Sequence, residues 1–447
     1  MQAGFETVEI TPPLGVPLAG HFNRRPARGV HDPLTAYAMV LDDGRRQVAL
    51  LGTDLLGIPD AVADRVRALV AESVGLPPQA IMTWATHTHA GPGVMDAAED
   101  GAHGEYLAML PAMLAGCIIG AYRNLRPVSA RLGVGYEDRI SFNRNYRMHD
   151  GTVRTNPGVG NPGAIAMDGP IDPDVIALLL ADTDGTCGTC GVLVNFACHP
   201  DVLGSGNYHC SADYPYYLRQ ALRTVYGKQL SVLFANGTCG NLNHINVFAK
   251  QHQGGHDHSR MMGRTLAGEV MKLDAHMCEA ALGPLWFDSQ QVELPLRRFT
   301  DDEIANFRQI LADTEATASQ LSSANFARGR ALRAMRTVEA GITSQPVEVQ
   351  VLRLGDLAVV GIPGEYFVEF GLYIKQHSPA PATMVVELAN GSVGYIPTEA
   401  AISQGGYEGS STRFEAQAGQ MLADAALEML AAGYETVACD AGHSQSD

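Results

Sequence analysis

Hydrophobic residues along the chain recur with two different periods, which predicts a fold that mixes strands and helices. Apolar runs of strand type occupy residues 47–56, 80–88, 191–199, 230–237, 347–364 and 383–390. Between them, apolar residues at three- and four-residue spacing occupy 61–74, 105–124, 212–226, 259–274 and 415–432. The first period is that of a strand and the second that of a helix. The pattern predicts an α/β, or mixed α+β, fold rather than a helical bundle or a β-sandwich.

Residues 301–340 interrupt this alternation. The segment is rich in Ala, Arg, Glu and Gln, has a sparse apolar stripe, and follows a strand pattern that ends at Pro295. We expect a helical hairpin inserted into one large domain that spans residues 1–439. Such polar helices commonly cover a site or contact another subunit, so a homo-oligomer is plausible. The polar residues 440–447 are expected to form a disordered tail.

The amino-acid composition argues against some classes of binding partner. The chain of 447 residues carries 48 acidic against 31 basic residues, a net charge of -17, and no run of Lys or Arg. An acidic surface disfavours nucleic acid and anionic membranes, so we expect neither as a partner. The polar N-terminus does not resemble a secretion signal, and no uncharged apolar stretch approaches the roughly 18 residues of a membrane span. We therefore expect a cytoplasmic protein without a membrane span, whose eight cysteines are reduced thiols.

Polar side chains follow several of the predicted strands where each strand ends. The segment THTHAGPG places His87 and His89 two residues apart, on the same face of an extended chain. His199 follows a second strand and Glu365 a third. Strand ends that meet at one edge of a sheet are where α/β enzymes place their sites. The alternatives are solvated or capping histidines and, for Glu365, a carboxylate favoured by a helix N-terminus.

Two neutral imidazoles and one carboxylate, with a position left for water, form the ligand set of a catalytic zinc ion. The chain contains no compact zinc motif such as HExxH. The ligands of such a site would come from segments far apart in the sequence, and spacing alone does not establish it.

Taken in order, the motifs FETVEITPPLGVPLAG, RGVHDPLTAYAMVLDDG, WATHTHAGPG, SFNRN, FACHPDVLG, ANGTCGN, IPGEYF and GYIPTEAAISQGGYEGSST resemble the catalytic domain of the neutral/alkaline ceramidase family. The match extends from the N-terminus to about residue 415 and is thin in the helical hairpin. Its most specific parts are THTHAGPG and the closing YIPT and YEG segments. The resemblance implies a single large ceramidase-like domain with one zinc ion that hydrolyses an amide bond.

The resemblance also implies roles for individual residues, by matching motif. Four would hold the zinc ion: His87, His199, Glu365 and, through its phenol oxygen, Tyr395. His89 would hydrogen-bond the substrate or the tetrahedral intermediate and could protonate the leaving amine. Tyr407 would donate to the developing oxyanion, and Arg144 would orient the substrate.

Departures from the family pattern change the expected substrate. The family loop GDxSPN reads Gly240-Asn241-Leu242-Asn243-His244 here, without a serine, which favours metal-activated water over a serine nucleophile. We expect Asn241, Asn243 and His244 to contact a polar group of the substrate, which argues against ceramide itself. The chain also ends soon after the YEG segment, so we expect a short branch of the family without the C-terminal sandwich domain.

Several further residues are candidates for supporting roles. Buried carboxylates near a metal often orient its histidine ligands, and we assign Asp54 and Asp213 to this role. His256 and His258 could form a second metal or substrate site, or simply begin a helix.

The sequence thus predicts a zinc-dependent hydrolase of an amide bond in a small or medium polar molecule. An esterase or lactonase on the same zinc site, and a binding protein that retains the fold without turnover, are the alternatives.

Overall fold

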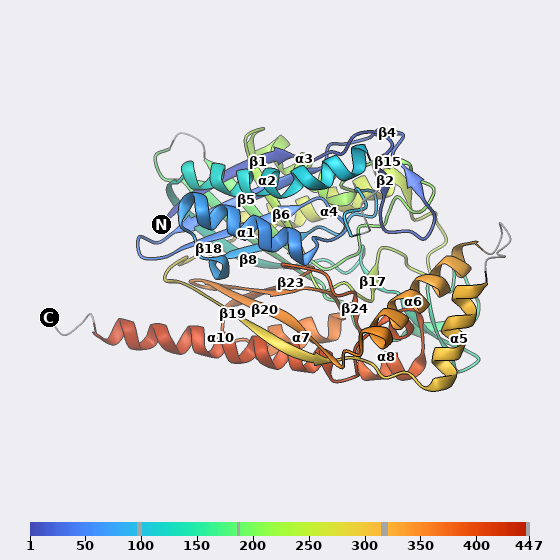
Figure 1. Ribbon diagram of the computed structural model, residues 1–447. Coiled ribbons are helices and arrows are strands. Elements are labelled where there is room, and N and C mark those ends of the chain that lie inside the picture. Colours follow the sequence, from blue (N-terminus) through green and yellow to red (C-terminus); the bar gives the residue numbers. More distant parts are fainter. Residues whose placement is uncertain (96–100, 186–187, 314–320, 444–447) are drawn as a thin grey trace.

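Two β-sheets lie face to face, and helices cover the outer side of each, giving four layers (Figure 1). The computed structural model describes the whole chain except residues 96–100, 186–187, 314–320 and 444–447. The mixed α/β architecture predicted from the hydrophobic periods is confirmed.

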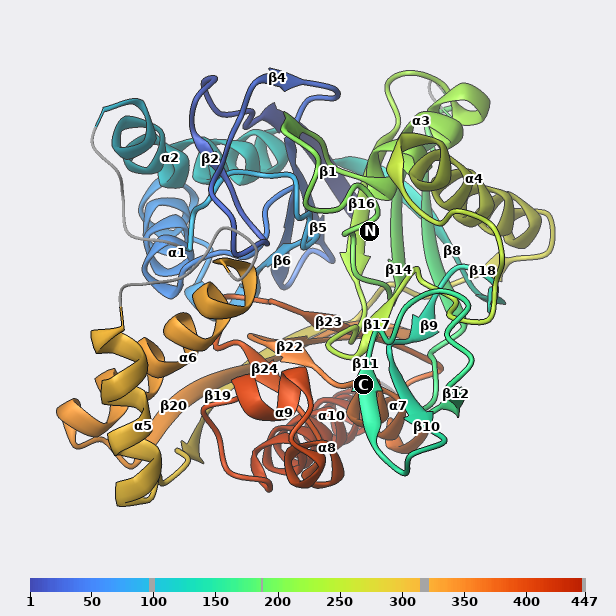
Figure 2. The same cartoon turned by 90° about the vertical axis from the view of Figure 1, so that its right-hand side faces the viewer.

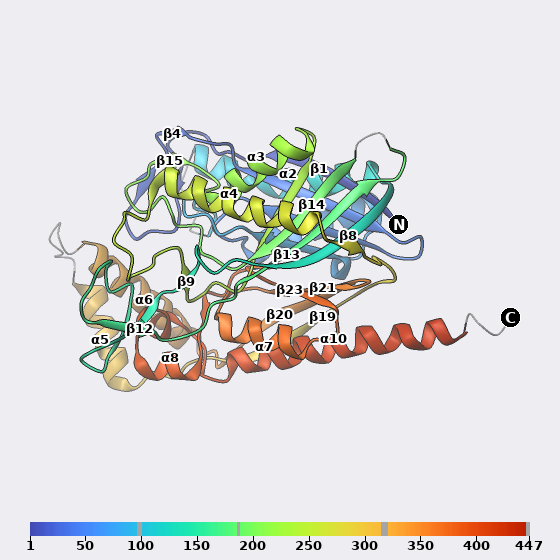
Figure 3. The ribbon, with the colours of Figure 1, turned by 180° about the vertical axis from the view of Figure 1, so that it is seen from behind.

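The larger sheet carries helices on its outer face. Its strand order is β16 (Ser231–Asn236), β14 (Thr189–Phe196), β13 (Asp174–Asp182), β8 (Arg126–Tyr136), β1 (Gln2–Glu9), β5 (Thr35–Asp42), β6 (Gln47–Thr53) and β7 (Ile81–Ala85), with β18 (Cys278–Glu279) paired to β8. The covering helices are α1 (Asp60–Val74), α2 (Ala102–Arg123), α3 (Tyr214–Tyr226) and α4 (Gly255–Asp274). Figure 3 shows α3 and α4 over the part of the sheet that contains β8, β13 and β14.

The smaller sheet is covered by two C-terminal helices. Its order is β19 (Leu285–Pro295), β20 (Ser344–Leu354), β21 (Leu357–Ile362) and β23 (Ala382–Glu387), and its helices are α7 (Val368–His377) and α10 (Ala418–His443). The two sheets bury a common core that includes Trp84 and Met39 from the larger sheet and Leu352 and Met384 from the smaller one. The indole Nε1 of Trp84 donates to the carbonyl oxygen of Phe234 at 2.8 Å, so this large side chain is buried with its polar atom satisfied.

Short elements complete the fold. They are β2 (Pro17–Leu18), β3 (Arg25–Pro26), β4 (Gly29–Val30), β9 (Phe142–Asn143), β10 (Asn145–Met148), β11 (Val153–Thr155), β12 (Ala164–Met167), β15 (His209–Cys210), β17 (Leu242–Asn243), β22 (Glu365–Tyr366), β24 (Tyr395–Ile396), η1 (Pro78–Ala80), α8 (Glu399–Gln404) and α9 (Tyr407–Ser411). Strands β22 and β24 pair in parallel and bring Glu365 beside Tyr395.

Helix α2 corrects one statement made from the sequence. A window of 18 residues within this 22-residue helix has a mean hydropathy of 1.5, so by length and composition the helix could span a bilayer, contrary to our expectation that no apolar stretch would approach this length. Its buried residues, including Leu110, Leu114 and Ile118, pack in one cluster with the larger sheet and α1. A core helix of a soluble protein passes the same test of length and composition.

The segment 301–340 contains two helices, α5 (Asp301–Ala312) and α6 (Leu321–Ala340), and the residues that join them lie outside the described part. The helices pack on each other through a small cluster formed by Phe307, Ala331, Ala334 and Met335. They lie side by side at one end of the molecule (Figure 2). At the C-terminus, α10 continues to His443, so the predicted start of a disordered tail at Asp440 falls inside a helix.

The parallel strand pairs position the site. Strands β6 and β7, β14 and β16, and β21 and β23 are parallel neighbours. His87 comes two residues after the end of β7, His199 three after β14 and Glu365 three after β21. Residues at the carboxyl ends of parallel strands meet at one edge, so the topology collects these three side chains from both sheets.

Candidate metal centre

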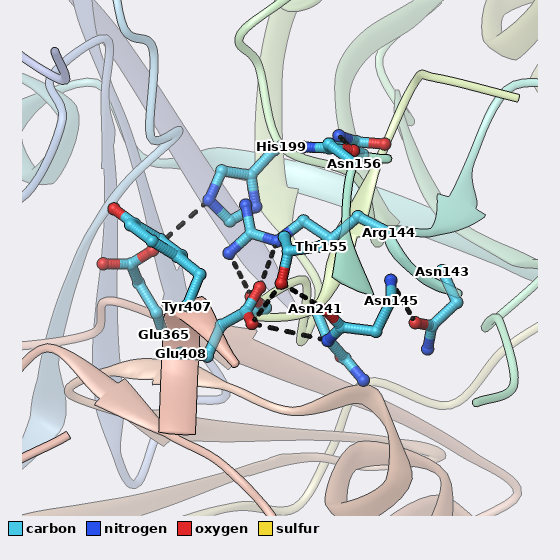
Figure 4. A network of polar contacts seen from close by, with 12 residues as sticks. Asn143, Arg144, Asn145, Thr155, Asn156, His199, Asn241, Glu365, Tyr407 and Glu408 are labelled. Atoms are coloured by element: carbon cyan, nitrogen blue, oxygen red, sulfur yellow. Dashed lines mark hydrogen bonds and ion pairs between the residues drawn. The ribbon is translucent and has the colours of Figure 1, made fainter. Parts of the chain in front are cut away.

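Three predicted ligands, His87, His199 and Glu365, come together at the carboxyl ends of the strands. The Nε2 atoms of His87 and His199 lie 3.1 Å apart. The Oε2 atom of Glu365 lies 3.4 Å from Nε2 of His87 and 3.3 Å from Nε2 of His199. Figure 4 shows His199 and Glu365 facing each other. His87 and Glu365 are 278 positions apart in the sequence (365 minus 87). The fold nevertheless brings one atom from each of the three residues to a common point.

The opposite nitrogen of each imidazole is held by a backbone carbonyl. Nδ1 of His87 lies 2.7 Å from the oxygen of Leu56, and Nδ1 of His199 lies 2.8 Å from the oxygen of Cys239. A carbonyl oxygen only accepts, so each Nδ1 carries the proton and each neutral imidazole turns an Nε2 lone pair toward the other. Two lone pairs at this distance repel each other unless a positive charge lies between them.

The electrostatics favour such a charge. Burial acts to raise the pKa of Glu365, but His199 and His87 hold it well below its usual range, so the group is a carboxylate. Burial acts to lower the pKa of His87, yet Glu365 outweighs it and the pKa is raised, so a proton on Nε2 of His87 supplies this positive charge when no ion is bound. Burial and the nearby Arg144 lower the pKa of His199 to about 4. The Oε2 atom of Glu365 is buried, and the two Nε2 atoms face it at 3.3 and 3.4 Å, which is longer than a good charge-assisted hydrogen bond. A cation would satisfy this oxygen and both lone pairs, so the donor set fits a metal ion.

A third imidazole adjoins the group. Nε2 of His89 lies 3.4 Å from Nε2 of His87, and one nitrogen each from His87, His89 and His199 fall within 4.8 Å of one another. On its other side, Nδ1 of His89 lies 3.8 Å from a carboxylate oxygen of Asp201. The two histidines of THTHAGPG therefore both reach the candidate centre.

Backbone geometry at the site is constrained. His87 has φ of 72°, a left-handed conformation that non-glycine residues adopt at a cost of about 1 to 3 kcal/mol. Its N–H donates to the carbonyl of Leu55 at 2.9 Å. Gly240 permits a close approach of two backbones, because a Cβ there would lie 2.5 Å from the carbonyl oxygen of Glu365. Strain of this kind persists where the surrounding structure fixes a functional geometry.

Two phenols lie beside the carboxylate. Tyr395 is the register partner of Glu365 between β24 and β22, and its ring meets that of Tyr407 edge to face at 5.5 Å. Burial raises the pKa of Tyr407, and Glu365 raises it further. Burial and Glu365 also raise the pKa of Tyr395 well above its usual value. In the metal-free protein both phenols are therefore protonated, and each can donate a hydrogen bond.

Arg144 stands behind these phenols rather than in the substrate cavity, which corrects its expected role. Its guanidinium carbon lies 5.5 Å from the ring centre of Tyr395 and 5.8 Å from that of Tyr407. Its Nε donates to Glu408 at 2.6 Å (Figure 4). Its Nη2 donates to the carbonyl of Gly240 at 2.6 Å. The hydrogen bonds and ring contacts of Arg144 make it a positioning residue.

Two buried glutamates were not identified from the sequence. Glu408 binds Arg144, and Asn145 and Thr155 also donate to it, at 3.4 and 3.2 Å. Glu387 accepts from the thiol of Cys239 at 2.8 Å and from its backbone N–H at 2.9 Å, and Cys239 in turn supplies the carbonyl that holds His199. Burial raises the pKa of Glu387 to about 7. In the sequence, Glu387 could have been noticed as the single carboxylate at the end of the apolar strand ATMVVE.

The candidate centre opens into a cavity of about 610 Å³. His87, His89, Glu365, Tyr395 and Tyr407 line it together with Pro17, Leu18, Ala19, Gly20, His21, Phe22, Asn23, Arg24, Leu56, Met95, His103, Arg333, Ser392, Val393, Gly394, Ser411 and Arg413. A volume of this size accommodates a small-molecule ligand.

The residues of the GNLNH loop that were expected to contact substrate instead bind other residues of the protein. Asn241 donates to Glu369 at 3.0 Å and accepts from the N–H of Val368 at 2.9 Å. Asn243 donates to Asn156 at 2.9 Å. His244 contacts the carbonyl of Gln253 through Nε2 at 3.2 Å. The three residues are buried and are not among those that line the cavity, so the structure gives them a role in holding the loop.

Asp54 and Asp213 were expected to orient the histidine ligands, but backbone carbonyls hold those imidazoles. The two carboxylates instead support the segments around the site. Asp54 accepts from Arg219 at 2.6 Å and from the N–H of Thr35 at 3.0 Å. Asp213 accepts from the N–H of Val202 at 2.9 Å, which fixes the loop that follows His199. Burial raises the pKa of Asp54 to about 6 and that of Asp213 to about 7.

His256 and His258 face different neighbours. The ring of His256 stacks on that of His31 at 3.5 Å, whereas the ring of His258 lies 5.6 Å from that of His244. Within the described residues, neither belongs to a group of three side chains close enough to share a metal ion. The structure gives no support to a second metal site there.

Comparisons with known proteins identify the fold. No protein-family model matches the sequence, and a search of curated proteins finds no match. Neutral ceramidase from Pseudomonas aeruginosa aligns with a TM-score of 0.74 and 19% identity, covering 96% of this chain and 74% of that chain. A structure described as ceramidase complexed with C2 aligns with a TM-score of 0.74 and 18% identity, covering 97% and 75%. The chain has a neutral ceramidase-like fold, as its motifs predicted.

Proposed function

We propose that the protein is a zinc-dependent hydrolase that cleaves an amide bond of a small or medium polar molecule. The observation that carries the proposal is the convergence of two Nε2 lone pairs and the Glu365 carboxylate within 3.1 to 3.4 Å at the wall of a cavity. His87, His199 and Glu365 would hold the ion, with Tyr395 as the fourth ligand that the motif resemblance implies. The fold shared with ceramidases, which are amide hydrolases, supports the type of bond.

A bound metal ion would supply chemistry that these side chains lack. Zinc bound there would act as a Lewis acid on the amide carbonyl and lower the pKa of water toward about 7.

Tyr407 would stabilise the negative charge that develops on the carbonyl oxygen. Its phenol is protonated, lines the cavity and stands beside Tyr395. A preorganised donor of this kind contributes about 3 kcal/mol to transition-state stabilisation where it has been measured. Arg144 and Glu408 keep the two rings in place, because their buried ion pair packs against them.

His89 would carry the proton to the leaving nitrogen. The leaving amine of an amide must be protonated, and an imidazole is the usual group for this transfer. His89 lines the cavity, and its Nε2 lies 3.4 Å from that of His87. Asp201 lies on the other side of the ring, with a carboxylate oxygen 3.8 Å from Nδ1 of His89.

The proposal is tested by measuring metal content by plasma mass spectrometry on the wild type and on two variants. Glu365→Ala removes the proposed ligand. Glu369→Ala removes a carboxylate of similar burial four positions away, which accepts a hydrogen bond from Asn241 and does not line the cavity. We expect about one zinc ion per chain in the wild type and Glu369→Ala, and its loss in Glu365→Ala.

The same three proteins are then screened against N-acyl compounds of increasing acyl length. We expect hydrolysis by the wild type and Glu369→Ala only. Metal that is indifferent to Glu365, or a zinc-loaded protein that cleaves none of the amides, would contradict the proposal.

A further inference from the structure

We propose that the substrate carries an anionic group, a carboxylate or a phosphate, that binds Arg333 and Arg413 in the same cavity as the candidate metal centre. This inference rests on the proposed function and names the class of amide that the cavity selects.

The described residues of the cavity wall carry a charge opposite to that of the chain. The chain has 48 acidic and 31 basic residues. Among the described residues that line the cavity, the cationic side chains are those of Arg24, Arg333 and Arg413, and the one carboxylate is Glu365, which is committed to the metal-binding group. A concave surface of one sign concentrates ligands of the other. The wall therefore favours an anionic ligand.

Arg333 and Arg413 together line a second, smaller hollow next to the cavity, and none of the described residues that line this hollow carries a carboxylate. Burial and then the charge of Arg333 lower the pKa of Arg413, while Asp60 opposes this effect. Within the described part of the chain, the polar partner found for the Arg413 guanidinium is the amide oxygen of Gln345, at 3.2 Å. With a neutral hydrogen-bond partner, this part-buried guanidinium can still form a charge-assisted hydrogen bond with a bound anion.

The position of helix α6 sets the expected distance between the anionic group of the ligand and its amide bond. Phe326 on this helix stacks on Tyr407, with ring centres 5.1 Å apart, and meets Phe22 edge to face at 5.3 Å. Arg333 follows Phe326 by two turns and so lies on the same face of α6, about 10 Å along the axis. That separation corresponds to about three residues of extended chain. The anionic group would therefore stand about 10 Å from the amide carbonyl that Tyr407 contacts.

The geometry of the guanidinium suits oxygen anions. A guanidinium presents planar N–H donors that match both oxygens of a carboxylate or a phosphate, and such charge-assisted bonds are about twice as strong as neutral ones. A long-chain amide without charge would gain no charge-assisted hydrogen bond from either arginine. The helical hairpin thus contributes one wall of the cavity and one of its two anion-binding side chains.

The test uses one amide scaffold with three end groups placed about 10 Å from the scissile bond: a carboxylate, a phosphate monoester and a neutral carboxamide. For the zinc-loaded wild type we expect kcat/KM at least about 10-fold higher for a charged substrate than for the neutral one. Whichever anion is preferred identifies the end group. Arg333→Gln and Arg413→Gln should each reduce this ratio, and the double variant should bring it to about one.

Arg308→Gln is the matched control, because Arg308 is exposed on the same hairpin and does not line the cavity. It should keep the wild-type ratio. Since Arg333 is itself exposed, its substitution leaves the core intact and the test does not depend on Arg413 alone.

Binding measurements with uncleavable analogues distinguish a failure of this inference from a failure of the proposed function. Ketone analogues, in which CH₂ replaces the amide N–H, cannot be hydrolysed, and their affinity for the wild type and the arginine variants is measured by calorimetry. Tighter binding of the charged analogue, lost in the arginine variants, would support the inference even if no amide were cleaved. Equal binding of charged and neutral analogues, or a preference unchanged in the double variant, would overturn it.

Discussion

At the scale of single residues, the candidate centre depends on what holds each imidazole. Leu56 and Cys239 fix the tautomers of His87 and His199 through backbone carbonyls, and Glu387 fixes Cys239. Partners of this kind orient metal ligands and raise their basicity. A backbone carbonyl cannot be altered by a side-chain substitution, so the ligands themselves are the residues to change.

Substitution of the histidines should separate metal binding from catalysis. His87→Ala and His199→Ala should each lose most of the bound zinc, since each removes one of three converging donor atoms. His89→Ala and Tyr407→Phe should retain zinc and lose about 10²- to 10³-fold in kcat. Metal content and steady-state kinetics on the same preparations check both outcomes. Stoichiometric zinc in both of the first two variants would show that the site assignment is wrong.

The buried ion pair of Arg144 and Glu408 should be important for stability. Their side chains are 8% and 1% exposed, so Glu408→Gln leaves a buried guanidinium without its anion. We expect a loss of about 3 kcal/mol in the free energy of unfolding, measured by urea denaturation. Glu399→Gln in the exposed helix α8 is the control and should change it by less than about 0.5 kcal/mol. A Glu408→Gln variant as stable as the control would show that the pair contributes nothing.

At the scale of elements, the helical hairpin is part of the cavity. The sequence predicted helices in 301–340 and left open whether they cover the site or meet another subunit. The contacts of Phe326 with Phe22 and Tyr407 place α6 over the cavity. The hydrophobic periods also located the strands and helices that bear the site, although 347–364 divides into β20 and β21 around Gly355.

Removal of the Phe326 ring should weaken the cavity wall without affecting the metal. Aromatic pairs contribute about 0.5 to 1.5 kcal/mol beyond their buried area. Phe326→Ala should therefore lower kcat/KM by about 3- to 10-fold at unchanged zinc content. Leu332→Ala, at a position 42% exposed on the same helix, should leave kcat/KM at the wild-type value. If both variants behave alike, the hairpin does not shape the cavity.

At the scale of the whole molecule, the candidate ligands join the two sheets. His87 and His199 follow strands of the larger sheet, whereas Glu365 and Tyr395 lie in the β22 and β24 pair that follows β21 and β23 of the smaller one. A metal ion bound by all four would link the two halves of the sandwich. Because the ion binds the folded chain, its affinity adds to the free energy of unfolding.

Removal of the metal should accordingly lower the thermal stability. At a free zinc concentration 1,000 times its Kd, the bound ion adds about 4 kcal/mol to the free energy of unfolding. We expect a chelator to lower the Tm of the wild type in calorimetry, and restored zinc to raise it. The Tm of Glu365→Ala should not respond to either treatment. A wild-type Tm that is insensitive to chelation would argue against a metal shared by the two sheets.

Sequence patterns alone predicted the fold class, the strands and helices that bear the site, and the residue types gathered at the strand ends, but they missed β1, β5, β8 and β13 of the larger sheet. The predicted features follow from hydrophobic period and residue chemistry, which are local properties of the chain. The tertiary structure decided which polar groups meet. It turned Asn241 and Asn243 inward, set Arg144 behind the tyrosines, and gave the buried Glu408 a partner 264 positions away. It also placed Arg333 and Arg413 in one cavity. Such pairings depend on the packing of distant segments, for which no local period exists.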